Sequence, residues 1–94
     1  DALPICVTLW ITNFFTEYEG NTLQSLEAIT SRFDQFVQQD AHFIFVTNEI
    51  GLGGISANDL QRRFTDLIGW VNQYIASKSD EVILMVSSIP MKIK

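Results

Sequence analysis

The residues best suited to chemistry lie between His42 and Asn58, in the stretch HFIFVTNEIGLGGISAN. A run of β-branched and aromatic residues ends at Thr47, Asn48 and Glu49, and glycines follow at positions 51, 53 and 54. A strand, a glycine-rich turn and a helix start, in this order, are typical of the sites that α/β proteins build at the carboxyl ends of strands. We therefore expect function to lie at Asn48, Glu49 and the loop that follows them.

This loop has the features of an anion-binding turn. Glycines let the backbone approach a ligand closely, and a helix N-terminus presents free N–H groups, so residues Gly51 to Ser56 could hold a phosphate or a carboxylate. Glu49 could bind Mg²⁺ or a donor group of ribose or guanine. The pattern is incomplete, because Gly51-x-Gly53 lacks the third glycine of the dinucleotide fingerprint and the chain contains no G-x-x-x-x-G-K-S/T. A tight strand-to-helix connection without a ligand is the alternative.

The sequence indicates neither a catalytic triad nor a metal cluster. His42 is the single histidine, has no partner at ligand spacing, and is expected to be structural or exposed. Cys6 is the single cysteine, so an internal disulfide is excluded and a reducing, cytoplasmic location fits. We interpret Cys6 as a small buried hydrophobic residue.

Length and composition indicate one small globular domain, residues 1–94. The charged fraction of 18% is low for a globular protein, which suggests apolar surface that an oligomer or a further domain would cover. A net charge of −5 argues against nucleic-acid binding, and no apolar run is long enough to span a membrane. Because the chain lacks an initiator Met and starts directly in a predicted strand, we expect a piece of a longer protein.

Hydrophobic periodicity predicts alternating strands and helices. In order, the predicted elements are a strand at Leu3–Val7, a short helix within Thr8–Phe15, a helix at Thr22–Gln39, a strand at Phe43–Thr47, a helix at Ala57–Ser77, a strand at Glu81–Ser87 and a final edge strand at Met91–Lys94. This alternation predicts an α/β fold with a mostly parallel sheet and helices packed on its faces.

Local signals refine this prediction. Asn21 is the expected N-cap of the first long helix, and Ser56, or alternatively Asn58, caps the second. The central strand is apolar on both faces, which is typical of an interior strand covered by helices. Gly69 lies in mid-helix, where we expect another backbone to approach closely. An uncovered sheet edge should pair with another chain.

The stretch Val46 to Gly53, VTNEIGLG, resembles the VTNEVGxG segment of the adenosylcobinamide kinase/adenosylcobinamide-phosphate guanylyltransferase family, bifunctional enzymes of cobalamin biosynthesis. Upstream, residues 6–13, CVTLWITN, resemble the family's C-L-T-L-W-L-T-N. The likeness resumes at residues 80–82 and 86–92 and covers nearly the whole chain except the first long helix. It also follows the second long helix, whose residues Asn58, Leu60, Arg62, Phe64, Asp66, Gly69, Asn72 and Gln73 resemble the family's N-x-L-x-R-x-F-x-D-x-x-G-R-x-N-Q.

The resemblance implies the carboxyl half of a P-loop NTPase-like fold, with a final antiparallel strand at the sheet edge. It implies phosphorylation of adenosylcobinamide with ATP or GTP, transfer of GMP from GTP to the product, participation of Mg²⁺, and a homo-oligomer. The residues it places at the nucleotide or substrate pocket are Thr8, Asn13, Thr47, Asn48, Glu49, Gly51, Gly53 and Arg62.

Three positions depart from the family pattern. Ile5 stands where the family has the acidic residue of the Walker B strand, Ser56 replaces a loop proline, and Trp70 replaces a helix arginine. The phosphate-binding loop and the histidine that carries GMP belong to the family's amino half. We therefore assign no catalytic or metal-binding residue here and expect this chain alone to be inactive. A non-catalytic assembly or ligand-binding module of the same fold is the alternative.

Overall fold

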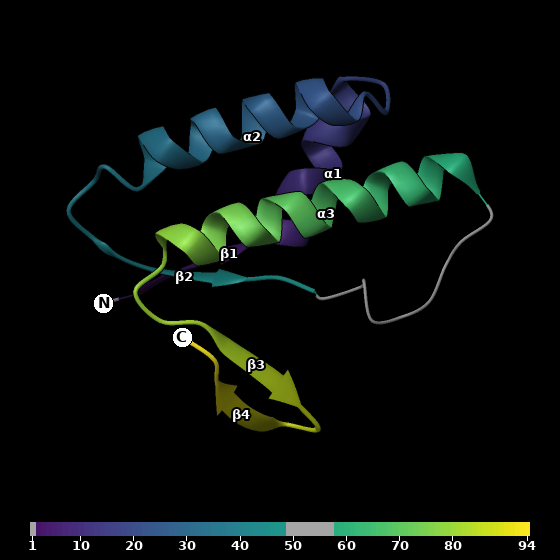
Figure 1. The fold of residues 1–94 in the computed structure, drawn as a ribbon. Helices are drawn as coiled ribbons and strands as arrows, with labels where there is room; N and C mark the ends of the chain where they lie inside the picture. Colours follow the sequence, from purple (N-terminus) through teal and green to yellow (C-terminus); the bar gives the residue numbers. More distant parts are fainter. Residues whose placement is uncertain (1, 49–57) are drawn as a thin grey trace.

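The computed structural model of this chain describes residues 2–48 and 58–94 (Figure 1). Glu49, Gly51, Gly53 and Ser56 lie outside the described residues, so the predictions made for them are not placed. In chain order the elements are β1 (Ala2–Cys6), α1 (Val7–Glu17), α2 (Thr22–Phe36), β2 (His42–Val46), α3 (Asp59–Lys78), β3 (Ile83–Val86) and β4 (Ile89–Lys92). The predicted alternation of strands and helices is confirmed, with most boundaries moved by one to three residues.

β1 and β2 form a parallel pair. Ala2 lies opposite His42 and Cys6 opposite Val46, with no bulge between them. The strands run in the same direction because α1 and α2 make the connection between them, as parallel pairing requires. The predicted parallel arrangement is therefore confirmed for these strands, although this sheet has only two strands within residues 2–48 and 58–94.

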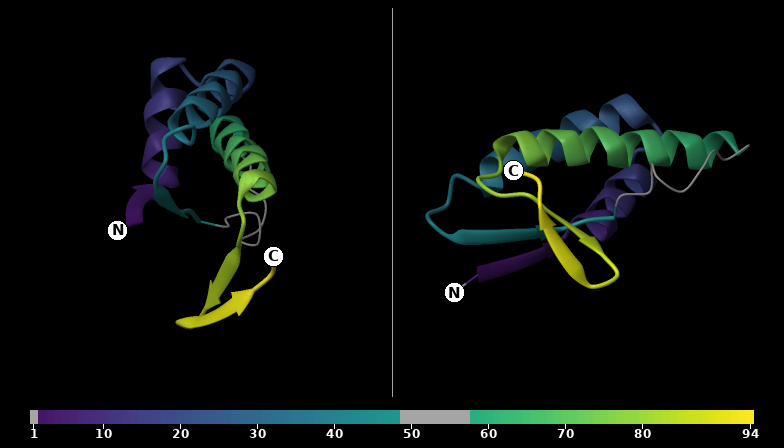
Figure 2. Two further views of the ribbon diagram at one scale, coloured as in Figure 1. Left: turned by 90° about the vertical axis from the view of Figure 1, so that its left-hand side faces the viewer. Right: turned by 60° about the horizontal axis from the view of Figure 1, so that its bottom comes forward.

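The core lies among the three helices rather than between helices and a broad sheet. α2 buries one apolar stripe, as its spacing predicts, and α1 buries another. α2 and α3 lie side by side, and α1 packs against both of them (Figures 1 and 2). The buried apolar residues are Val7, Ile11, Phe15, Ile29, Phe33, Leu67, Ile68, Val71 and Ile75. Of the strand residues, Phe45 packs against this cluster, and its ring lies 5.0 Å from that of Phe33.

The expectation that the central strand is an interior strand is wrong for this structure. Side chains of β2 alternate between half-buried and exposed positions, with Ile44 and Val46 exposed at 45% and 56%. The cause is coverage from one side only, because the helices pack on the face that carries Phe43 and Phe45. The apolar sequence of β2 would allow both faces of the strand to be buried, but in this structure only one face is covered.

The carboxyl-terminal strands are also placed differently from the prediction. β3 and β4 form a separate antiparallel hairpin that projects away from the helices, and neither strand joins β1 and β2 (Figures 1 and 2). Ser87 and Ser88 make the two-residue turn, with φ values of 51° and 64°. Positive φ at both central residues is the geometry of a type I′ turn, whose twist matches that of an antiparallel pair. The final strand is antiparallel, as predicted, but it pairs only with β3.

The helix caps agree with the sequence prediction, whereas Gly69 does not. Asn21 caps α2 by accepting the Gln24 N–H at 2.9 Å, as predicted, and the alternative cap Asn58 is the one that α3 uses, accepting from the Gln61 N–H at 3.1 Å. Gly69 was expected to face a close backbone, but a Cβ built there meets no described atom within 4 Å.

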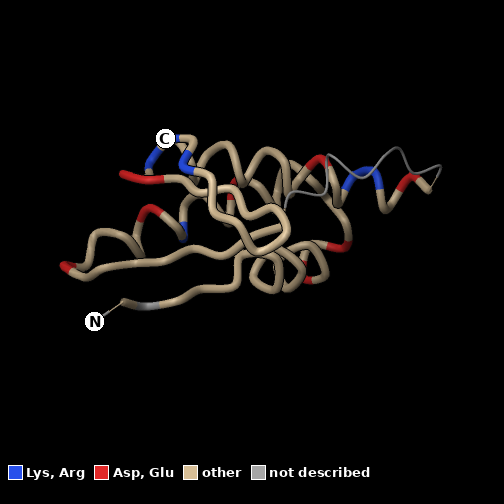
Figure 3. Tube along the Cα trace, turned by 90° about the horizontal axis from the view of Figure 1, so that it is seen from below, with Lys and Arg blue, Asp and Glu red and all other residues tan. Residues whose placement is uncertain are grey.

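Charge is sparse on the four described strands, where Lys92 is the one Lys, Arg, Asp or Glu side chain (Figure 3). Lys92 pairs with Glu81 at 3.3 Å, and the Lys94 ammonium donates to the Ala76 and Ser77 carbonyls at the end of α3. Cation binding there is favourable because the last carbonyls of a helix are unpaired and carry partial negative charge. Among the described helices, none has the length and apolarity to cross a membrane.

Candidate strand-end site

The parallel pair brings two predicted site segments to the same end of the sheet. Because Cys6 and Val46 are in register, Thr8 and the pair Thr47–Asn48 follow their strands at matching levels. β1 passes directly into α1, so Thr8 lies in the first turn of that helix. This is the edge at which open α/β sheets bind ligands.

Thr47 and Asn48 are both held by one side chain from α3. The Thr47 hydroxyl donates to Asn72 Oδ1 at 2.7 Å, and Asn72 Nδ2 donates to the Asn48 carbonyl at 3.1 Å. Asn72 follows the buried Val71 and lies one turn beyond the buried Ile68, which places it on the flank of α3 that faces the sheet. The strand tip is thereby fixed to the helix by two hydrogen bonds.

Thr8 has an unusual environment for a hydroxyl. Its Oγ1 is buried and has no hydrogen-bond partner among the described residues, while its carbonyl accepts from the Thr12 hydroxyl at 2.8 Å. The helix it opens has no side-chain N-cap, because Cys6 precedes it. Unpaired donors at the start of α1 therefore lie at the same sheet end as Thr47.

Asn13 lies farther along α1 and belongs to a different feature, a half-open cavity of about 370 Å³ between α1, α2 and the strands. Cys6 lies at this cavity and its thiol is exposed, so its interpretation as a buried residue is wrong. Among the described strands β1 pairs with β2 alone, on one side, which leaves the last side chain of β1 uncovered. The lining is mostly apolar and consists of Ile5, Cys6, Leu9, Trp10, Asn13, Arg32, Phe36 and Phe45.

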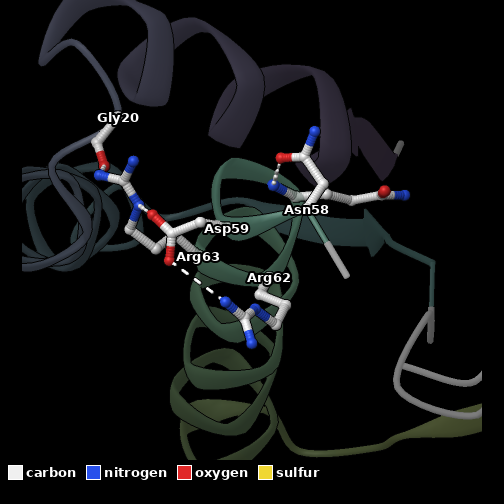
Figure 4. A network of polar contacts seen from close by, with 6 residues as sticks. Gly20, Asn58, Asp59, Arg62 and Arg63 are labelled. Carbon is white, nitrogen blue, oxygen red and sulfur yellow. Dashed lines mark hydrogen bonds and ion pairs between the residues drawn. The ribbon is translucent and has the colours of Figure 1, made fainter. Parts of the chain in front are cut away.

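Arg62 does not join Thr47 and Asn48. It lies in the first turn of α3, where its guanidinium faces Asp59 at 3.6 Å (Figure 4). Ten residues separate it from Asn72, which corresponds to about 15 Å along the helix axis. The neighbouring Arg63 also reaches Asp59, at 3.1 Å, and donates to the Gly20 carbonyl at 2.9 Å (Figure 4). Arg63 thus joins α3 to the turn after α1, while Arg62 remains on the exposed side.

The described part of the site offers neutral hydrogen-bonding groups rather than charge. Hydroxyls and amides at Thr8, Thr47 and Asn48 can recognise polar ligand atoms, whereas Mg²⁺ prefers carboxylate oxygens. Within residues 2–48 and 58–94, no three acidic, histidine or cysteine side chains are grouped so that they could hold a metal ion. The described residues therefore do not fit a magnesium site, and no step through the metal follows from them.

The fold and the strand ends define an α/β protein with a polar site where parallel strands end. The model of the cobinamide kinase / cobinamide phosphate guanyltransferase family matches residues 2–93, and the chain belongs to this family. The resemblance seen in its motifs is thus confirmed.

Three curated relatives agree with this assignment. The chain is 50% identical to the bifunctional adenosylcobalamin biosynthesis protein CobU of Salmonella typhimurium. The matched region covers all of this chain and 59% of that protein. It is 36% identical to CobU of Escherichia coli, over 95% of this chain and 55% of that protein. It is 33% identical to CobP of Pseudomonas aeruginosa, over 95% of this chain and 50% of that protein. The chain therefore spans about half to three fifths of the length of these relatives.

Sequence reasoning did not assign Asn72 to the site, although the family motif includes it. A signal was present, because Asn72 is a polar residue on the border of the apolar stripe formed by Leu67, Ile68, Val71 and Ile75. A polar side chain in that position needs a hydrogen-bond partner on a neighbouring element. The strand tip at Thr47 and Asn48 supplies it.

Proposed function

We propose that this chain supplies one wall of the nucleotide or cobinamide pocket of an adenosylcobinamide kinase/adenosylcobinamide-phosphate guanylyltransferase in cobalamin biosynthesis. In this proposal the complete protein has the carboxyl half of a P-loop NTPase-like fold in residues 1–94, and the phosphate-binding loop lies elsewhere. The observation that carries it is the meeting of Thr8, Thr47 and Asn48 at one end of a parallel strand pair, in a chain of this family.

The wall binds and orients rather than reacts. Thr47 and Asn48 are exposed and present a hydroxyl and an amide to a ligand, and the buried Thr8 hydroxyl is free to bond a group that enters beside it. Glu49, Gly51 and Gly53 continue this wall in the proposal, with Asn13 and Arg62 at its margins. ATP or GTP with Mg²⁺ would be held mainly by residues outside this chain, which explains why we expect no turnover from it alone.

The test uses the full natural polypeptide, with adenosylcobinamide, ATP and GTP supplied together with Mg²⁺. We expect phosphorylation of adenosylcobinamide and then transfer of GMP, both followed by mass spectrometry of the corrinoid product. An Asn48→Ala variant should bind nucleotide or corrinoid more weakly, with Gln38→Ala, an exposed position near the end of α2, as the matched control. Absence of both products with a correctly folded polypeptide would refute the enzymatic proposal.

A second candidate function is a non-catalytic assembly module of the same fold, in the cytoplasm and as a homo-oligomer. The observation that favours it is the exposed apolar surface of the hairpin, where Ile83, Met85, Ile89 and Met91 are each about half exposed or more. Ile5 in place of the family's acidic residue is consistent with it. Light scattering of the full polypeptide separates the two: a stable oligomer without product formation favours the module, and an active monomer contradicts it.

A further inference from the structure

The hydrogen bonds at the tip of β2 have a defined direction. The Asn48 carbonyl can only accept, so the Asn72 side chain must turn its NH₂ group toward that carbonyl, at 3.1 Å. The amide oxygen of Asn72 then faces Thr47, and an amide oxygen can only accept as well. The Thr47 hydroxyl is therefore the donor in the 2.7 Å contact, and its single proton is committed to Asn72.

This direction decides what Thr47 can offer to a ligand. A hydroxyl has one proton and two acceptor lone pairs, so a Thr47 hydroxyl bonded to Asn72 retains acceptor capacity only. A phosphate or carboxylate oxygen needs a donor and would meet lone pairs there. An amino, amide or ring N–H, or a ligand hydroxyl, would find a matched partner.

We propose that Asn72 is a positioning residue for the strand-end site. It makes the Thr47 hydroxyl accept a hydrogen bond from an N–H or O–H group of the ligand rather than donate one to a phosphate. This inference rests on the proposed function, because it deepens the role of the same site. Asn72 also fixes the backbone of Asn48, so both consecutive residues are held before the ligand arrives. Thr47 and Asn48 are exposed, which leaves their outer faces open to a ligand.

The experiment measures binding to the full natural polypeptide by titration calorimetry, with three probes: GTP, adenosylcobinamide and inorganic triphosphate. GTP and adenosylcobinamide carry N–H and O–H donors, and inorganic triphosphate presents phosphate oxygens alone. Thr47→Val removes the hydroxyl at nearly constant shape, Thr47→Ser retains it, and Asn72→Ala removes the group that directs it. Thr65→Val is the matched control, because among the described residues its hydroxyl bonds within α3, to the Gln61 carbonyl at 2.9 Å.

We expect Thr47→Val to weaken one donor-bearing probe roughly three- to tenfold, the range of a single lost hydrogen bond, and to leave inorganic triphosphate unchanged. Thr47→Ser should restore the affinity, and Asn72→Ala should weaken the same probe. The double variant Thr47→Val/Asn72→Ala should bind this probe only slightly more weakly than either single variant, because both substitutions act through one hydroxyl. The probe that responds, GTP or adenosylcobinamide, identifies the source of the donor.

The failures are distinguishable. If wild type binds neither GTP nor adenosylcobinamide, the proposed function is refuted, and so is the proposed role of Thr47 in ligand binding. If wild type binds them but Thr47→Val weakens the binding of inorganic triphosphate equally, the Thr47 hydroxyl donates a hydrogen bond to phosphate. In that case this inference alone is overturned. It is also overturned if Asn72→Ala lowers the melting temperature while every affinity stays at the wild-type value.

Discussion

The phenol of Tyr74 in α3 donates to both carboxylate oxygens of Asp34 in α2, at 2.7 Å each. The ring of Tyr74 also packs edge-on against the buried Phe33, with centroids 5.9 Å apart, and carries the Lys78 ammonium over its face at 5.5 Å. One side chain thus joins the apolar core to a polar contact between two helices. Because the phenol can lose its proton, this link between α2 and α3 depends on pH.

The Tyr74–Asp34 contact predicts a loss of stability at high pH. The hydrogen bond to Asp34, desolvation and the negative charge of the carboxylate raise the pKa of Tyr74 above its usual 10.0. A raised pKa means that the folded state favours the protonated phenol, so this stabilisation is complete below pH 10 and is lost as the pH rises through the folded-state pKa. Tyr74→Phe should be less stable than wild type at pH 7, and the difference should narrow above pH 10.

Urea unfolding at a series of pH values measures this difference. Tyr18→Phe is the matched control, because no hydrogen bond of the Tyr18 hydroxyl occurs within the described residues. The difference in the free energy of unfolding between wild type and Tyr18→Phe should not change above pH 10. A wild-type advantage over Tyr74→Phe that is constant from pH 7 to beyond pH 11 would contradict the predicted role of the hydrogen bond.

The two described glycines predict opposite effects of the same substitution. Gly69→Ala should stabilise the protein by about 1 kcal/mol, because alanine is the better helix former and its Cβ meets open space. Gly20→Ala should destabilise it by about 1–2 kcal/mol, because φ is +78° there and the new Cβ lies 3.0 Å from Leu60 Cδ1. Thermal unfolding by circular dichroism compares the two directly. Destabilisation by Gly69→Ala would show that another backbone does approach this helix.

The location of the core predicts which leucine matters. Leu67 is fully buried among the three helices, so Leu67→Ala should cost about 2–5 kcal/mol through lost apolar burial and the cavity left behind. Leu23 lies on α2 but is 72% exposed, so Leu23→Ala should change stability by less than about 0.5 kcal/mol. Chemical denaturation of both variants provides the measurement. Equal costs would mean that Leu23 is buried in the working protein.

The start of α2 predicts a measurable capping effect. Asn21→Ala removes the side-chain oxygen that accepts the Gln24 N–H, and it should cost about 1 kcal/mol. Asn21→Ser keeps a capping oxygen and should retain most of the stability. Amide hydrogen exchange at Gln24 follows the cap itself, and unchanged protection in the alanine variant would exclude this role.

Much of the local structure could be predicted because it depends on neighbours in sequence. The apolar stripe of α3, the cap at Asn21 and the parallel direction of β1 and β2 all follow from short-range spacing or from connection length. The family resemblance assigned Thr8 and Thr47 to one pocket, and each lies within two residues of the end of a strand.

What could not be predicted depends on which surfaces are covered. An apolar run at β2 has the same sequence pattern whether one face or two are buried. The exposure of Cys6 arises because no described strand lies on the other side of β1. The hairpin turn at Ser87–Ser88 lacks the Asn-Gly or Asp-Gly signal of a type I′ turn, so it was missed. Asn72 was missed because its partners lie on another element, more than twenty residues away in sequence.

The register between β1 and β2 has a kinetic consequence. Ala2 can meet His42 only after the whole of α1 and α2 has folded back between them, so no local turn can begin this pairing. Closing so long a loop is entropically costly, and such contacts slow the search for the native state. We therefore expect the α1–α2 pair to form first and the two strands to join last. In a refolding experiment, the Cys6 thiol and the tip at Thr47 would then be among the last groups to acquire their native environments.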